Sequence, residues 1–256
     1  MKNFAIYLCL AMVSVWAHAE ENMVKLDVGR EAAQLPVYVM TQPEAVATLI
    51  LLPGGDGGSG KIVDGQPTSK NFLNRSRGLF FAEKFNVLVA FRATDLQGLD
   101  YDYRVSANHM QEIAAVIRHA RQLSPAPVWL IGTSRGTVSG TAATIALPKD
   151  MVQGLVLTSS VTSKKTGAIA TQEIGKIGVP TLVVHHKNDA CKICVPHEAA
   201  RIVGGLKSSG IKKFLMVEGG SDPVGDPCEA QHWHGFINYE QETVRMISQW
   251  IKAPQN

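Results

Sequence analysis

The chain has 256 residues, of which 45% are apolar and 18% are charged, and its formal net charge is +3 at neutral pH. These values fit one globular domain with a sizeable buried core. The basic residues are scattered along the chain, and only Lys164-Lys165 and Lys212-Lys213 are adjacent. This pattern gives no support to a nucleic-acid partner or to binding at a membrane surface. The sequence carries no pattern that specifies an oligomeric state.

Residues 1 to 19 have the pattern of a signal peptide. Lys2 supplies a positive charge, residues 4 to 15 form an apolar run, and Ala17-His18-Ala19 is a small-x-small cleavage site. We therefore expect export to the periplasm or the extracellular medium after cleavage there, which leaves residues 20–256 as a single domain. The apolar run is too short to span a bilayer comfortably, and no later segment is long enough. No integral membrane segment is therefore expected in the mature chain.

Short apolar runs rich in β-branched residues alternate with segments of helical periodicity. The runs predict eight strands, at residues 24–28, 35–40, 47–53, 85–91, 127–133, 152–159, 180–186 and 212–218. The last six lack polar alternation, as expected of strands buried on both faces of a parallel sheet. Apolar residues at helical spacing predict helices at residues 106–123, 136–147, 168–177, 197–209 and 240–252. The alternation predicts an α/β fold, with a doubly wound, mostly parallel sheet of about eight strands flanked by helices.

A glycine-rich stretch follows the third predicted strand. From Gly55 it reads G-D-G-G-S-G-K, which matches the phosphate-binding pattern G-x-x-x-x-G-K-[ST] up to its last position. Ile62 then stands where a hydroxyl should bind Mg²⁺, and Gly65 and Pro67 follow where a helix would need its first turns. The sequence therefore disfavours a nucleotide site, and the glycines need another explanation.

A possible nucleophile follows the fifth predicted strand directly. Residues 132–136 read G-T-S-R-G, between that strand and the predicted helix at 136–147. In this context the pattern G-x-S-x-G is typical of a serine raised above the sheet on a tight turn, where glycines leave the necessary space. An ordinary strand-to-helix turn with a capping serine would fit the same five residues. Ser134 also needs a base before it can act as a nucleophile.

An acid and a base follow later strands in the order that such a site requires. Asp189 is the one carboxylate in the turn after the seventh predicted strand, and the turn after the sixth contains none. The loop after the last strand carries His232 and His234, and we favour His234 because it comes just before Gly235. Ser134 is then the nucleophile and His234 the general base, with Asp189 orienting the imidazole.

These residues make the chain resemble a serine hydrolase of the α/β-hydrolase superfamily, over essentially the whole sequence after residue 19. The resemblance rests on G-T-S-R-G, on Asp189 after the penultimate strand and on His234 after the last one. The cysteine and His-Gly of the last loop are similar to an exported subgroup that lacks a lid. The resemblance implies the α/β-hydrolase fold and hydrolysis of small-molecule esters, with neither cofactor nor metal.

The resemblance also accounts for the glycine-rich stretch. In such enzymes the loop after the early strand donates one backbone N–H to the substrate oxyanion, and the residue after the nucleophile donates another. The donors implied here are Gly55 or Asp56 and, from the second position, Arg135. The family's His-Gly-Gly pattern is not kept, because Pro53 occupies the position of the histidine.

Three cysteines follow the predicted signal peptide, namely Cys191, Cys194 and Cys228. An odd number in an oxidising compartment predicts one bridge and one free thiol. If Asp189 and His234 meet, their loops are adjacent, and a bridge between Cys191 and Cys228 is reasonable.

An alternative use of these cysteines stays open from the sequence. Cys191-Lys-Ile-Cys194 also has the spacing of a redox pair or of half a metal site. A zinc site would normally need a second pair of ligands, which the sequence lacks, so no metal is expected. The histidines that could complete such a site are more simply interpreted as strand-end or surface residues: His185, His186 and His197.

The segment between the sixth and seventh predicted strands limits what can cover the pocket. It has about twenty residues, most of which the predicted helix at 168–177 requires. We therefore expect an open pocket without a lid, suited to small acyl groups. Two other functions remain compatible with the sequence, namely a peptidase or amidase that uses the same three residues and a non-catalytic binding protein on the same fold.

Overall fold

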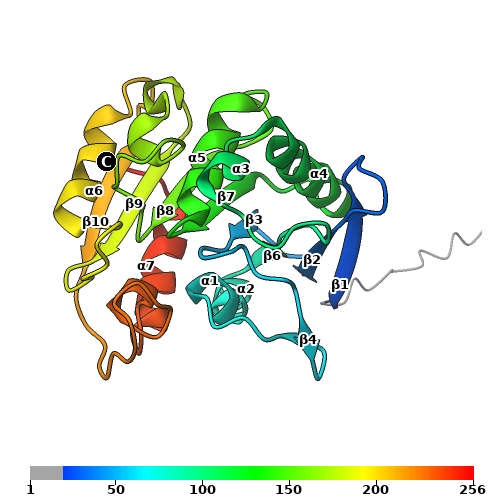
Figure 1. The fold of residues 1–256 in the computed structure, drawn as a ribbon, viewed down its shortest axis with the longest axis horizontal. Coiled ribbons are helices and arrows are strands. Elements are labelled where there is room, and N and C mark those ends of the chain that lie inside the picture. Colours follow the sequence, from blue (N-terminus) through cyan, green and yellow to red (C-terminus); the bar gives the residue numbers. More distant parts are fainter. Residues whose placement is uncertain (1–19) are drawn as a thin grey trace, which may run out of the picture.

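The computed structural model describes residues 20–256, so the predicted signal peptide at 1–19 lies outside the described residues. Eight strands form one sheet in the order β1-β2-β6-β3-β7-β8-β9-β10 (Figure 1). Strands β1 and β2 run antiparallel to their neighbours, and the other six are parallel. The predicted α/β fold with a mostly parallel sheet is confirmed. The strands are β1 (Glu20–Asp27), β2 (Gln34–Thr41), β3 (Ala47–Leu52), β6 (Phe85–Ala90), β7 (Val128–Thr133), β8 (Gly154–Thr158), β9 (Thr181–His186) and β10 (Lys212–Val217).

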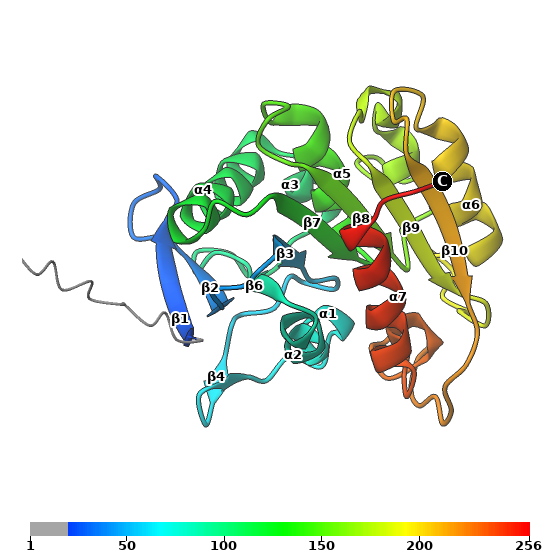
Figure 2. The ribbon, with the colours of Figure 1, turned by 180° about the vertical axis from the view of Figure 1, so that it is seen from behind.

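Helices cover both faces of the sheet, which is therefore the middle of three layers. The apolar cluster on one face includes side chains of α4, α5 and α6, and the cluster on the other includes α1, α2 and α7 (Figures 1 and 2). Among residues 20–256, no helix combines the length and apolar character needed to cross a membrane. The helices are α1 (Phe72–Arg75), α2 (Arg77–Ala82), α3 (Tyr101–Arg104), α4 (Ala107–Leu123), α5 (Gly136–Ala146), α6 (Pro196–Gly205) and α7 (Glu240–Lys252).

Helix α4 follows the predicted boundaries closely because local signals define both of its ends. At the start, the Ser106 side chain accepts a hydrogen bond from the His109 amide and so satisfies one of the free N–H groups of the first turn. At the end, Pro125 disfavours helical geometry in the residue before it. Between these signals, apolar side chains at helical spacing, including Ile113 and Ile117, are buried against the sheet.

The strands differ in burial according to their place in the sheet. Every residue of β3, β6, β7, β8 and β9 is buried. Strand β10 was also expected to be buried on both faces, but it lies at the edge, where Met216 is 41% exposed. Lys212 and Lys213 begin this strand, and charged side chains of this kind protect a free sheet edge from pairing with another chain.

The predicted helix at 168–177 is wrong. The segment instead forms two 3₁₀ turns, η1 (Ile169–Thr171) and η2 (Ile174–Lys176). Gly175 weakens a segment that is already too short for a stable helix, and the hydroxyl of Thr171 donates to the carbonyl of Ala168.

Several other elements are too short to be predicted from the periodicity of apolar residues. They are the helices α1, α2 and α3 and the small hairpin of β4 (Ile62–Val63) and β5 (Gln66–Pro67). Each is shorter than the window over which an apolar period can be recognised.

Candidate active site

Ser134 lies on a sharp turn between β7 and α5. Its φ of +51° is in the left-handed region, which is costly for a residue with a side chain and is found at functional turns. The turn leaves no space for side chains on either side. A Cβ atom added at Gly132 would lie 2.5 Å from the carbonyl oxygen of Gly136, and one added at Gly136 would lie 1.9 Å from that of Leu52. The amide of Ser134 donates to Thr158 in β8, which holds the turn against the sheet.

The loop after β3 touches this turn from the other side. A Cβ atom added at Gly54 would lie 2.7 Å from Cβ of Ser134, so only glycine permits the approach. Among residues 20–256, the main-chain N–H groups of Gly55, Asp56 and Arg135 donate to no protein acceptor. The amides that the sequence suggested as oxyanion donors are therefore free. Gly54 could not be singled out from the sequence, because its role depends on contact with a residue 80 positions later in the chain.

His234 and Asp189 form a buried pair at the carboxyl end of β9. Nδ1 of His234 lies 2.9 Å from Oδ2 of Asp189, and the other carboxylate oxygen accepts from the amide of Cys191 at 2.9 Å. Because the carboxylate can only accept, Nδ1 carries the proton and Nε2 is left as a proton acceptor. Among the residues that the structure describes, Nε2 of His234 is buried and has no hydrogen-bond partner.

The loop that carries His234 is held by main-chain contacts. Arg75 donates to the carbonyls of Ala230 and Gly235, at 2.8 Å each, and forms an ion pair with Glu240. The hydroxyl of Ser159 donates to the carbonyl of His234 at 2.8 Å. These contacts fix the backbone on both sides of the imidazole. Neither Arg75 nor Ser159 was singled out from the sequence, because their acceptors are carbonyl groups that any residue could supply.

The structure separates the two histidines between which the sequence had to choose. His234 contacts Asp189 and lines the same pocket as Ser134, whereas His232 is not among the lining residues and instead lies edge-on to the ring of Trp233. His234 belongs to a 3₁₀ turn, η3 (Trp233–Gly235). The turn directs the two side chains apart, which two positions in an extended loop would not do.

Ser134 and His234 face one open pocket of about 460 Å³. Within residues 20–256, no hydrogen bond joins the serine hydroxyl to Nε2 of the histidine. Such bonds are often long in sites without substrate and tighten when substrate binds. The remaining walls come from the loop after β3, the start of α1 and the last loop: Pro53 to Asp56, Gly58, Ser69 to Phe72, Thr133, Arg135, Ile193, Cys228 to Ala230 and Gly235.

Cys191 and Cys228 form a disulfide, the pairing expected from the sequence. It ties the turn that carries Asp189 to the loop that carries His234. Cys194 is free and fully buried, and the sulfur atoms of Cys191 and Cys194 lie within 4.8 Å of a ring nitrogen of His234. Since Cys191 is already bonded to sulfur, this group does not offer two thiolates to a metal. Burial raises the pKa of the Cys194 thiol, which keeps it protonated and unreactive.

The alternative metal or redox site does not assemble around the other histidines. His185 accepts a hydrogen bond from the amide of Ser160, and His186 stacks on Trp233 with the ring centres 4.9 Å apart. His197 is exposed on α6. His185 and His186 do end β9, as expected, but both are buried rather than at the surface.

No protein-family model matches the chain, and no curated protein matches its sequence. Solved structures do match it over most of its length. The esterase Pf2001 of Pyrococcus furiosus is 12% identical with a TM-score of 0.66, and the match covers 93% of this chain and 94% of that one. A dienelactone hydrolase from Anabaena variabilis is 15% identical with a TM-score of 0.62, and the match covers 93% and 99% of the two chains.

A third solved structure is that of a larger enzyme. The acylaminoacyl peptidase of Pyrococcus horikoshii is 11% identical with a TM-score of 0.61, and the match covers 93% of this chain and 42% of that one. Identities this low establish a shared fold and leave the substrate open. The expected α/β-hydrolase fold is thereby confirmed.

We predict that Gly136→Ala damages the site and the fold together. The added methyl group would overlap the carbonyl of Leu52, so β3 and α5 must move apart, at a cost of about 1–3 kcal/mol of unfolding free energy. Chemical denaturation measures this loss. The control is Gly78→Ala on the exposed surface of α2, where no atom lies within 4 Å and stability should stay equal or rise. Equal stability in Gly136→Ala would contradict the close approach.

We predict that His185 makes the protein less stable in acid. Burial lowers the pKa of this side chain from 6.5 to about 3, and nearby Asp189 offsets the effect only in part. Below pH 6.5 the unfolded chain binds a proton that the folded chain refuses, so stability falls by about 1.4 kcal/mol per pH unit from this group alone. The difference in unfolding free energy between the wild type and His185→Gln should therefore shift between pH 6.5 and 4.

The control for this measurement is His197→Gln, which removes an exposed histidine. Its stability should follow that of the wild type across the same pH range. A pH-independent difference between the wild type and His185→Gln would show that the buried imidazole does not resist protonation.

Proposed function

We propose that this chain, which has the α/β-hydrolase fold, is an exported serine hydrolase that cleaves ester bonds of small acyl substrates. Ser134 is the nucleophile, His234 the general base and Asp189 the group that orients the imidazole. One observation carries the proposal: the buried His234–Asp189 pair leaves Nε2 unpartnered in the pocket that Ser134 also lines.

The reaction follows from the roles of these groups. Ser134 attacks the ester carbonyl while Nε2 of His234 takes the hydroxyl proton, and Asp189 stabilises the imidazolium that forms. The negative charge of the tetrahedral intermediate is held by the free amide of Arg135 and by that of Gly55 or Asp56. His234 then gives the proton to the departing alcohol. Water, activated by the same imidazole, releases the acyl group from Ser134.

The shape of the pocket supports small acyl groups. The segment between β8 and β9, where a lid would have to be inserted, contains only the two 3₁₀ turns, and its Ala168 and Ile169 are buried. Ala168 packs with Val138 of α5 rather than over the pocket. Only a few apolar side chains, chiefly Phe72 and Ile193, line the pocket beside polar groups. A long acyl chain would find little apolar surface to bury there.

The solved structures support hydrolysis as the reaction and leave two kinds of substrate open. An esterase and a dienelactone hydrolase share the fold, and so does an acylaminoacyl peptidase. Amide hydrolysis is therefore the second candidate for this site. Export is supported by the signal-peptide pattern of residues 1–19 and by the disulfide, since such bonds persist in oxidising compartments.

We predict that Ser134→Ala abolishes covalent labelling by a fluorophosphonate probe and lowers kcat by roughly 10⁴-fold or more, because the nucleophile is removed. His234→Ala should cause a comparable loss, whereas His232→Ala should keep substantial activity. Labelling detected on a gel and initial rates on nitrophenyl acetate measure both effects. The matched control is Ser208→Ala, at an exposed serine outside the pocket. Normal labelling of Ser134→Ala would show that another residue is the nucleophile, whereas a wild type that neither labels nor turns over would favour a binding protein.

We predict that kcat/KM on nitrophenyl esters is highest for short acyl chains and shows no activation at a lipid interface. Each methylene that stays in water forgoes about 0.8 kcal/mol of binding, so an open pocket gains little from a longer chain. Rates from acetyl to dodecanoyl esters, with matched anilides beside them, measure the preference. A maximum at long chains would contradict the open pocket, and faster cleavage of anilides would favour an amidase.

A further inference from the structure

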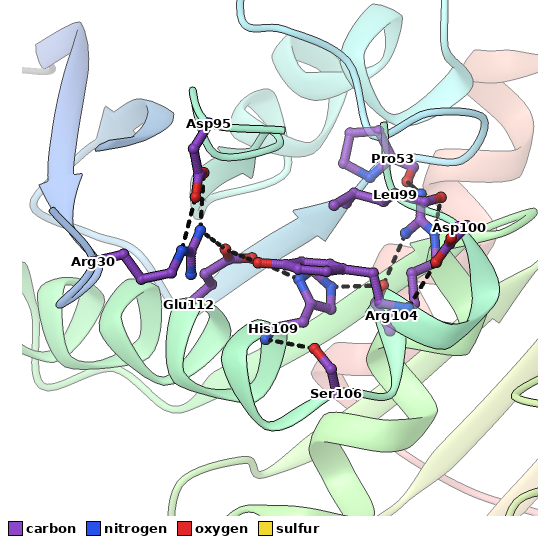
Figure 3. A network of polar contacts seen from close by, with 11 residues as sticks. Arg30, Pro53, Asp95, Leu99, Asp100, Arg104, Ser106, His109 and Glu112 are labelled. Carbon is purple, nitrogen blue, oxygen red and sulfur yellow. Dashed lines mark hydrogen bonds and ion pairs between the residues drawn. The ribbon is translucent and has the colours of Figure 1, made fainter. Parts of the chain in front are cut away.

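A buried chain of polar contacts lies behind the loop that follows β3 (Figure 3). It ends at Arg104, the last residue of α3, which is 1% exposed. The guanidinium donates through Nε to the carbonyl of Leu99 at 3.2 Å and through Nη1 to the hydroxyl of Ser139 at 2.8 Å. Nη2 donates to the carbonyls of Pro53 and Gly55, at 3.3 and 3.2 Å. Arg104 therefore holds two carbonyl groups of the loop that supplies the proposed oxyanion donors.

The next link resembles a second Ser-His-acid arrangement. Nε2 of His109 lies 2.9 Å from the hydroxyl of Ser139, and Nδ1 lies 2.8 Å from a carboxylate oxygen of Glu112. However, Ser139 is fully buried and already accepts from Arg104, and the adjoining cavity of about 20 Å³ has room for one water molecule only. No substrate could reach this hydroxyl, so the arrangement is not a second reaction centre.

The direction of the hydrogen bonds is determined by the residues at the two ends of this series of polar contacts. Arg104 can only donate, so Ser139 accepts from it and gives its own proton to His109, which in turn donates through Nδ1 to Glu112. Burial lowers the pKa of His109, which keeps the ring neutral, as this sequence of bonds requires. Each link therefore depends on the one before it.

The other end of this series of polar contacts, at Glu112, is anchored to a separate part of the fold. Glu112, 1% exposed, also accepts from Arg30 and from the hydroxyl of Tyr103, at 2.7 Å each. Arg30 pairs in addition with Asp95 at 2.9 Å. The contacts thus run from the loop between β1 and β2, through α4 and α5, to the loop after β3.

The loop after β3 needs such an anchor because of its composition. Gly54 and Gly55 have no side chain to oppose a rotation of their peptide planes. A rotated plane would turn a carbonyl oxygen, rather than an N–H group, toward the developing negative charge. Arg104 lies on the side of the loop away from the pocket, since it lines the small cavity and not the cavity shared by Ser134 and His234. Its bonds draw the carbonyls of Pro53 and Gly55 to that side.

We infer that Arg104 is a positioning residue that keeps the loop Pro53–Asp56 oriented with its carbonyls away from Ser134 and its amides free for the oxyanion. The inference rests on the proposed function of Ser134. The bond network of Ser139, His109 and Glu112 fixes the guanidinium in turn.

The chemistry of the buried cation agrees with this role. Burial, together with the nearby positive charge of Arg135, lowers the pKa of Arg104 to about 9, and its hydrogen-bond partners are three carbonyls and one hydroxyl. A buried cation without a contacting carboxylate is costly, and an apolar side chain could fill the same volume at less cost. Only the planar guanidinium fork can reach all four acceptors together, because a lysine has a single compact ammonium group.

The test compares Arg104→Gln and Arg104→Lys with the wild type and with Leu206→Ala, a core truncation just after α6, outside the pocket. We expect Arg104→Gln to lower kcat by about 10²-fold, as the loss of one oxyanion donor does, with KM nearly unchanged. Affinity for phenylboronic acid, which forms a tetrahedral adduct with the serine, should fall in proportion. Arg104→Lys should lower kcat about as much as Arg104→Gln does, because a lysine keeps the charge but lacks the planar guanidinium that bonds both carbonyls.

Hydrogen exchange gives a readout that needs no turnover. In both Arg104 variants the amides of Gly57 and Gly58, which are hydrogen-bonded within the loop, should exchange faster, while those of α5 and β7 keep their protection. Unchanged exchange in this loop would overturn the inference even if the enzyme is active. A wild type that neither labels nor turns over would instead refute the proposed function, and the exchange data would still decide the role of Arg104.

Two further results would overturn the inference. One is full recovery of kcat in Arg104→Lys. The other is an equal loss of kcat in Leu206→Ala and Arg104→Gln when the two variants have lost the same thermal stability. That result would mean that the role of Arg104 is purely structural. If Arg104→Gln does not fold, Ser139→Ala and His109→Gln take its place. Each removes one support of the guanidinium, and each should show the same faster exchange with a smaller loss of kcat.

Discussion

The candidate site depends on how closely helix α5 approaches the carboxyl end of strand β3. A methyl group at Gly136 would come within 1.9 Å of the Leu52 carbonyl, so the helix and the strand are in direct main-chain contact. Strands β3 and β7 are parallel neighbours at the centre of the sheet, and their following loops therefore emerge at the same edge. The close contact brings Gly54 against Ser134, and residues with free amides on both loops line the same pocket as this serine.

Around this contact, main-chain carbonyls are held by arginine side chains. Arg75 bonds two carbonyls of the loop that carries His234, and Arg104 bonds two carbonyls of the loop after β3. A guanidinium suits this task because its donors form a rigid planar fork. The disulfide between Cys191 and Cys228 adds a covalent tie between the turn that carries Asp189 and the loop that carries His234. The loops that carry the groups of the proposed mechanism are thus held by hydrogen bonds to their backbone or by the disulfide.

The groups of the proposed mechanism could be suggested from the sequence, because their residue types and their order along the chain are visible there. Ser134 follows a strand within G-x-S-x-G, and Asp189 has no acidic rival in its turn. For the proposed base, the sequence leaves a choice between His232 and His234. Only the structure, with its turn at η3, shows that His234 contacts Asp189 and that His232 does not line the pocket. The supporting residues could not be identified, because Arg75 and Arg104 act on carbonyl oxygens, which every residue has and no sequence pattern marks.

The sequence by itself determined the α/β class, the eight main strands and the four long helices. Their signals are local, since buried strands need continuous apolar runs and amphipathic helices need a period of 3.6 residues. Only the tertiary structure decided which strand lies at the edge, where β10 leaves Met216 exposed, and it replaced the expected helix at 168–177 by two short turns. It also decided the contacts between loops that are distant in sequence, among them the buried path from Arg30 to Arg104. Those features depend on which segments meet after the sheet has assembled, and the local spacing of apolar residues carries no information about these contacts.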